Sequence, residues 1–86
     1  MDMEDLTVFW TIESIGPNQQ KGEKRAAKVV VIDDRGESLN YSLEQIPGGE
    51  TYLIDSKGGS IITVRYVEDI RDVAKGDRIA VSVSVK

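Results

Sequence analysis

The chain has 86 residues and a formal net charge of −4, and it contains neither cysteine nor histidine. The missing residue types exclude disulfide bonds, thiolate chemistry, cysteine metal sites and histidine acid–base catalysis. The acidity argues against a dedicated binder of duplex nucleic acid, because such binders gain affinity by neutralising phosphates. We expect residues 1–86 to form a single domain, since a chain of this length has room for one hydrophobic core.

The first half of the chain predicts three β-strands, because apolar and polar residues alternate with a period of two. The alternation covers about residues 5–15, where Phe9 on the second face indicates that this face is covered as well. After a polar loop, four consecutive β-branched residues end the segment 27–32 and favour a central strand buried on both faces. A turn sequence at 33–36 precedes a third alternating stretch at 38–44.

The second half of the chain predicts three more strands. A short strand at 51–54 follows a glycine-rich turn, and a longer alternating segment covers about residues 60–68. The stretch from 68 to 77 is charged and too short to form a helix without tertiary support. The last segment, residues 78–86, places valine and isoleucine on one side and small or charged residues on the other, as a half-buried strand does.

Six short strands separated by turns indicate an all-β fold. We predict a small antiparallel β-sandwich of six to seven strands with an immunoglobulin-like arrangement. The alternative is an OB-type β-barrel, because the order of strands and turns fits that architecture too. In either fold the strand edges are natural places for association with another chain.

A valine-rich run at 28–36 ends in aspartate and glycine, a threonine-to-glycine hairpin covers 51–58 with 62–64, and an alternating valine strand fills 76–83. In this order of elements the chain resembles bacterial immunoglobulin-like domains of the invasin type. The resemblance implies an immunoglobulin-like sandwich that serves structure or adhesion without catalysis.

One basic cluster lies in the polar loop and at the start of the second strand. It would suit a phosphate-contacting loop of an OB-type barrel, with tryptophan and tyrosine side chains as stacking platforms. The other interpretation is a solvated loop whose charge is offset by Glu13 and Glu23. The cluster consists of Lys21, Lys24, Arg25 and Lys28.

Acidic residues in two turns carry a weaker signal. Asp33, Asp34 and Asp55 could bind calcium through loop oxygens, but they follow no calcium-loop pattern. Aspartate at the start of a glycine-containing turn is explained by hydrogen bonds to the local backbone. The hydroxyl groups of the chain also lack a histidine as activating base. We therefore expect no enzyme activity, no catalytic residue, no metal site and no cofactor.

The final strand adds a candidate contact surface. Its second face carries the small side chains of Ala80, Ser82 and Ser84, which would let another backbone approach closely. We predict a non-enzymatic binding or structural module that works through protein–protein contacts, with a protein partner or with copies of itself, as in a virion component. The alternatives are an OB-type barrel that binds single-stranded nucleic acid or nucleotides, and a small inhibitor or ligand-sequestering protein.

No run of residues has the length and apolarity of a signal peptide or a membrane span. We expect no membrane partner. The composition fits a cytoplasmic protein, a virion protein and a domain excised from a secreted protein equally well.

Overall fold

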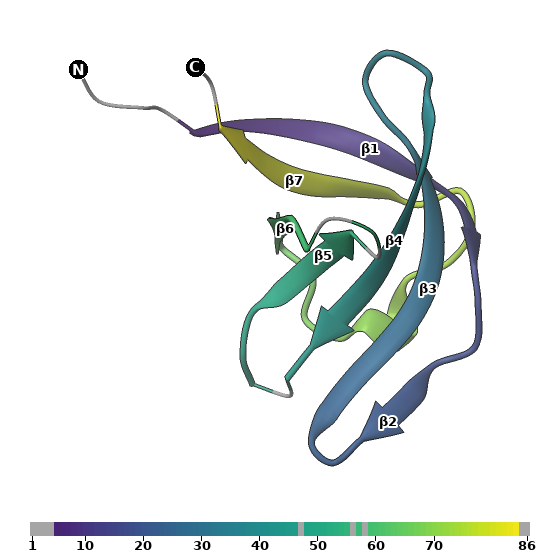
Figure 1. The fold of residues 1–86 in the computed structure, drawn as a ribbon, viewed down its shortest axis with the longest axis vertical. Helices are drawn as coiled ribbons and strands as arrows, with labels where there is room; N and C mark the ends of the chain where they lie inside the picture. Colours follow the sequence, from purple (N-terminus) through teal and green to yellow (C-terminus); the bar gives the residue numbers. More distant parts are fainter. Residues whose placement is uncertain (1–4, 47, 56, 58, 85–86) are drawn as a thin grey trace.

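The computed structural model describes residues 5–46, 48–55, 57 and 59–84. This part of the chain forms seven β-strands and one 3-10 turn (Figure 1). The all-β antiparallel class predicted from the sequence is confirmed. The elements are β1 (Asp5–Ile15), β2 (Gln19–Lys21), β3 (Lys24–Ile32), β4 (Ser38–Gln45), β5 (Thr51–Asp55), β6 (Ile61–Arg65), the 3-10 turn η1 (Ile70–Asp72) and β7 (Arg78–Ser84).

The strands form one sheet that closes on itself. Its order is β1, β7, β6, β5, β4, β3, and β1 also pairs with β3, which joins the two ends. The first part of β1 pairs with β7 over Asp5 to Thr11, and the last part pairs with β3 up to Ile15. A bulge between Ile12 and Ser14 bends β1 near the point where it changes neighbours. The result is a six-stranded up-and-down barrel, extended by the short β2 beside β3 (Figure 1).

The immunoglobulin-like sandwich predicted from the sequence is wrong, because the strands do not divide into two sheets. Sandwich strands and barrel strands both bury one face, so both give the same period-two pattern. The length and the bulge of β1 decide between them, since they allow this strand to reach two neighbours. The barrel alternative is supported, and the resemblance to invasin-type domains stays a prediction.

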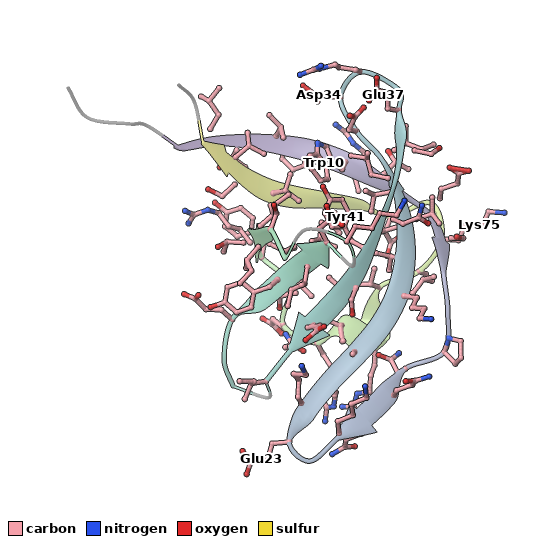
Figure 2. The ribbon with its side chains drawn as sticks, viewed as in Figure 1. Trp10, Glu23, Asp34, Glu37, Tyr41 and Lys75 are labelled. Atoms are coloured by element: carbon pink, nitrogen blue, oxygen red, sulfur yellow. The ribbon has the colours of Figure 1, made fainter. Side chains whose placement is uncertain are left out.

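The inward-facing side chains of the strands fill the barrel. Trp10 of β1 and Tyr41 of β4 point toward each other inside it, with ring centroids 6.0 Å apart (Figure 2). Burial of the inner face drives closure, because each apolar side chain removed from water contributes roughly 1.5–3 kcal/mol. The strand residues of the core cluster are Trp10, Ile12, Val29, Val31, Leu43, Leu53, Val64, Ile79 and Val81.

The strand β3 is covered unequally on its two faces. Val29 and Val31 point inward and are buried, whereas Val30 and Ile32 on the outer face are half-buried. The prediction of a strand buried on both faces therefore holds fully for the inner face only. The outer face of β3 faces a hollow on the surface of the barrel.

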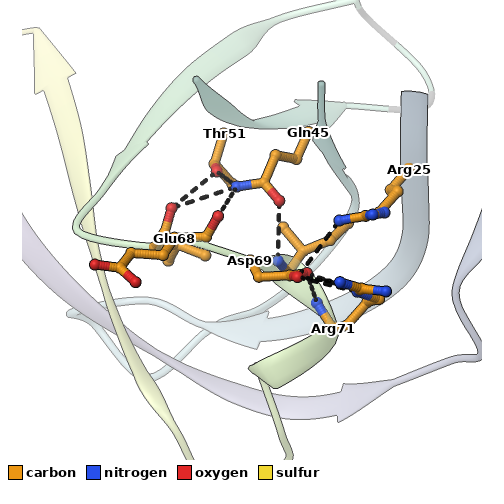
Figure 3. Close-up of polar contacts among 8 residues, drawn as sticks. Arg25, Gln45, Thr51, Glu68, Asp69 and Arg71 are labelled. Atoms are coloured by element: carbon orange, nitrogen blue, oxygen red, sulfur yellow. Dashed lines mark hydrogen bonds and ion pairs between the residues drawn. The ribbon is translucent and has the colours of Figure 1, made fainter. Parts of the chain in front are cut away.

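The turn η1 covers the end of the barrel where β4 finishes and β5 begins. Its first residue, Ile70, is completely buried, and the Ile70 N–H donates to Gln45 Oε1 at 3.1 Å. Gln45 Nε2 donates to Thr51 Oγ1 at 2.8 Å and to the carbonyl of Glu68 at 3.0 Å (Figure 3). These contacts supply the tertiary support that a single helical turn needs.

Candidate functional site

The basic cluster predicted from the sequence is divided between two sides of β3. Lys21, Lys24 and Lys28 line one hollow on the outer surface. Arg25 faces the other way, because successive strand residues alternate, and its guanidinium lies 3.4 Å from Asp69 Oδ2. The structure thus brings three of the four basic residues together and commits Arg25 to an ion pair.

A second hollow extends the first across the outer faces of β3 and β4. The two hollows have volumes of about 250 Å³ and 570 Å³, and both are lined by Gly16, Lys28 and Ser42. The larger one adds Lys57 from the β5–β6 turn. We call the two adjoining hollows together the basic groove, and its polar lining includes Ser14, Lys21, Lys24, Lys28, Asn40, Ser42, Glu44 and Lys57.

Glu44 is the carboxylate that lines this groove. Its Oε1 lies 2.6 Å from Lys24 Nζ, so one lysine charge is locally compensated. The hydrogen bond from Lys24 lowers the pKa of Glu44. Partial burial acts in the opposite direction, whereas the hydrogen bond from the Ser42 hydroxyl and the charges of Lys24 and Lys21 lower the pKa further. The carboxylate therefore stays ionised at neutral pH, and the remaining lysines give the groove a positive charge.

The acidic turns are explained by local hydrogen bonds. Asp33 Oδ1 accepts the backbone N–H groups of Arg35 and Glu37, at 2.9 Å and 2.8 Å. Asp55 Oδ1 accepts the N–H of Lys57 at 2.8 Å. Within the described residues no three acidic side chains lie close enough together to hold a metal ion. The carboxylates thus act as turn caps, as the pattern of aspartate before glycine predicts.

Asp69 joins η1 to β3. Its carboxylate accepts the N–H of Arg71 at 2.9 Å, receives the Arg71 guanidinium at 2.6 Å and faces Arg25 (Figure 3). The hydrogen bonds from the side chain and backbone of Arg71 lower the pKa of Asp69 from 3.8 to about 2. Because protonation would weaken these bonds, Asp69 stabilises the fold in its ionised form.

We expect Asp69→Asn to flatten the acid dependence of stability. The folded-state pKa of Asp69 lies below its unfolded value, so its contribution is complete above about pH 4 and disappears as pH falls toward about 2. Asparagine still caps the turn but cannot titrate. Thermal unfolding followed by circular dichroism from pH 7 to pH 2 measures the slope. Asp34→Asn, in an exposed turn, is the control, and equal slopes for the two variants would contradict this role.

The outer surface of β6, β7 and β1 forms the other candidate site. The register places Arg65, Ala80 and Phe9 in one row across the three strands, and Thr63, Ser82 and Thr7 in the next. We call this surface, together with Tyr66 at the end of β6, the β7 face. Its described outward side chains are apolar, hydroxyl-bearing or arginine: Thr7, Phe9, Thr11, Ile61, Thr63, Arg65, Arg78, Ala80 and Ser82.

Exposed aromatic side chains distinguish the β7 face from the rest of the barrel. Phe9 is 53% exposed and Tyr66 is 86% exposed, although the sequence indicated that the face of Phe9 is covered. The Arg78 guanidinium lies 5.2 Å from the centroid of the Phe9 ring, in cation–π contact. Arg78 and Tyr66 also line the same surface hollow, together with the acidic residues Glu68, Asp69, Asp72 and Asp77. The sequence pattern places Phe9 on the second face, but it cannot show that nothing packs against that face.

The small-residue face of β7 lies at the centre of this surface. Ala80 is only 4% exposed, because the longer side chains of Phe9 and Arg65 flank it in the register. Ser82 is half-buried, and the side chain of Ser84 lies outside the described part of the chain. A partner would therefore touch the flanking side chains and Ser82 rather than the methyl group of Ala80.

Comparisons with known proteins give no relative: no family model matches the chain, and no curated protein or solved structure shows a significant match. Among the described residues, no helix has the length and apolarity needed to cross a bilayer.

Proposed function

We propose that this protein is a non-enzymatic binding module that contacts a protein partner through the β7 face. The observation that carries this proposal is the exposed group of Phe9 and Tyr66 beside Arg65 and Arg78. Aromatic residues and arginine are enriched in protein interfaces and supply most of the residues that dominate binding energy, whereas lysine and carboxylates are depleted there. The described side chains of the β7 face match that composition.

Closure of the barrel directs association to faces rather than edges. Each of the six barrel strands pairs with a neighbour on both sides along at least part of its length. A partner strand would find few free backbone groups to pair with. The pairing of the strands on both sides supports contact through side chains on the outer surface. We therefore expect a partner to bind there and not at the strand edges that the sequence suggested.

The backbone of Tyr66 adds support. Its φ is 66°, in the left-handed region that costs a residue with a side chain roughly 1–2 kcal/mol. The strained conformation holds an aromatic ring in water at the end of β6. Strain at an exposed aromatic residue is a pointer to binding, because burying the ring in an interface would recover free energy.

The charge of the β7 face favours a partner other than a second copy. Arg65 and Arg78 are its charged side chains within the described part of the chain. Pairing two copies through this face would bring the arginines of both copies together, which is unfavourable. A partner that offers apolar groups and carboxylates is complementary to it. We expect the protein alone to remain monomeric across a concentration series.

Photo-crosslinking tests this function. Thr7, an exposed β1 residue on the β7 face, is replaced by p-benzoylphenylalanine, and in a separate protein Glu23 in the distant β2–β3 turn is replaced instead (Figure 2). In native cell extract we expect adducts with another protein from position 7 and far fewer from position 23, because a photo-probe reacts only with groups beside it and Glu23 lies outside the β7 face.

Charge reversal provides the specificity control. Arg78→Glu combined with the probe at position 7 should reduce the adducts about tenfold, whereas Arg35→Glu, an equal charge change in the β3–β4 turn, should leave them within about twofold. Three results would contradict the proposal: no adducts from position 7, equal yields from both probe positions, or adducts that Arg78→Glu does not affect. If position 7 formed adducts only with a second copy of this protein, the proposal that the partner is a different protein would be wrong.

A further inference from the structure

The basic groove lies on the opposite side of the barrel from the β7 face. In the order of the closed sheet, β4 is three strands away from β7. The groove runs over the outer faces of β3, β4 and the last part of β1. A ligand there would leave the β7 face accessible, so the two surfaces can bind independently.

The groove concentrates positive charge on an acidic chain. Its lining contains four lysines, Lys21, Lys24, Lys28 and Lys57, and a single carboxylate, Glu44. The chain as a whole has a net charge of −4. A solvated surface of average composition would carry the sign of the whole chain, so the local excess of lysine indicates an anionic ligand.

The local backbone keeps the groove open. After the bulge in β1, the N–H of Gly16 donates to the carbonyl of Lys28 at 2.8 Å and holds the chain against β3. Gly16 lines both hollows, and a side chain at this position would point toward that carbonyl, 3.5 Å from an added Cβ. Gly16 thus adds no side chain to the part of the groove that the two hollows share.

The neutral lining suggests which kind of anion fits. Val30 contributes an apolar side chain to the floor, and Ser14, Asn40 and Ser42 supply hydroxyl and amide groups. Lysine ammonium groups bind phosphate as point charges, while an apolar floor with nearby hydrogen-bonding groups suits a sugar and base. A hollow of 570 Å³ is within the range of pockets that hold small ligands.

We propose that the basic groove binds the phosphate groups of a nucleotide unit, supplied by a free nucleotide or by single-stranded nucleic acid. Lys28 is the central residue because it lines both hollows, and Lys57 holds the β5 side of the larger hollow. Arg25 takes no part, since it pairs with Asp69 on the other side of β3.

Fluorescence anisotropy with labelled oligothymidine tests this proposal at low salt. We expect binding whose logarithmic affinity falls with the logarithm of salt concentration with a slope of about −2, since each of about three phosphate contacts contributes roughly −0.7. Competition by ATP identifies the source: displacement of the oligonucleotide by ATP indicates a nucleotide site, and no displacement indicates a site for a nucleic-acid strand.

Lysine-to-glutamate variants locate the site. Lys28→Glu and, separately, Lys57→Glu should each weaken binding about tenfold, whereas Lys75→Glu, the same change at an exposed lysine outside the groove, should alter it less than about twofold (Figure 2). Circular dichroism checks that each variant folds, and Lys57 lies in a turn, so its variant remains informative if Lys28→Glu does not fold. The proposal is overturned by no binding at low salt, by binding of phosphatidylserine vesicles only, or by equal effects of the groove variants and the Lys75 variant.

Discussion

Ile70→Ala is expected to reduce the free energy of unfolding by about 3–4 kcal/mol. Ile70 is completely buried, and it belongs to a 3-10 turn of three residues that covers one end of the barrel. Removing its outer carbons leaves a cavity that the barrel strands cannot close, because they are fixed by pairing on both sides. A domain of this size has a total stability of roughly 4–13 kcal/mol, so this loss is a large fraction.

Urea unfolding of Ile70→Ala and Ile61→Ala measures the effect with a matched control. Both variants make the same chemical change, but Ile61 is 64% exposed on the outside of β6. We expect the control to lose less than about 1 kcal/mol, since it removes little buried surface. Similar losses in the two variants would show that η1 does not close the barrel as described.

Gln45→Leu should cost about 2–4 kcal/mol even though leucine is apolar and similar in size. Gln45 is 2% exposed, and its amide nitrogen donates to Thr51 Oγ1 and to the carbonyls of Val67 and Glu68. Its amide oxygen accepts the N–H of Ile70. Leucine would leave the buried N–H of Ile70 without this partner, and an unsatisfied buried group carries its full desolvation penalty.

Gln20→Leu is the control for this prediction. Gln20 lies in the exposed β2 and donates only to the carbonyl of Gly22 within the described contacts, at 3.1 Å. Its replacement should change stability by no more than about 0.5 kcal/mol. Hydrogen exchange adds a local measurement, because the amide of Ile70 should exchange much faster in Gln45→Leu. An Ile70 amide that stays protected in this variant would contradict the assigned role of Gln45.

The strands could be predicted from the sequence, whereas their closure could not. Alternation in 5–15 and the β-branched run ending at Ile32 identify strands, because these patterns reflect a pleated, half-buried backbone. Whether the strands close into a barrel depends on their register and on the bulge between Ile12 and Ser14. The residue types in this segment do not predict a bulge. The hydrogen-bonded pair of Gln45 and Thr51 could not be predicted from the sequence either, because it depends on tertiary contacts at the end of the barrel.

The candidate sites were predictable in part. Lys21, Lys24 and Lys28 are close in the sequence and belong to one hairpin, so their grouping could be predicted. Arg25 points to the other side of β3, because successive side chains of a strand alternate, and there it pairs with Asp69. Lys57 joins the groove only through the pairing of β4 with β5. The exposure of Phe9 depends on what covers β1 from outside, which is a property of the whole fold.

One sheet closes through β1, so its outer face rather than its strand edges is exposed to other molecules. Nuclear Overhauser effects between backbone protons test this closure directly. The structure predicts cross-strand contacts of β1 with β3, at Ile12 with Val31 and at Ser14 with Val30, together with contacts of β1 with β7, at Val8 with Val81. Observation of the β7 contacts without the β3 contacts would show an open sheet and contradict the account.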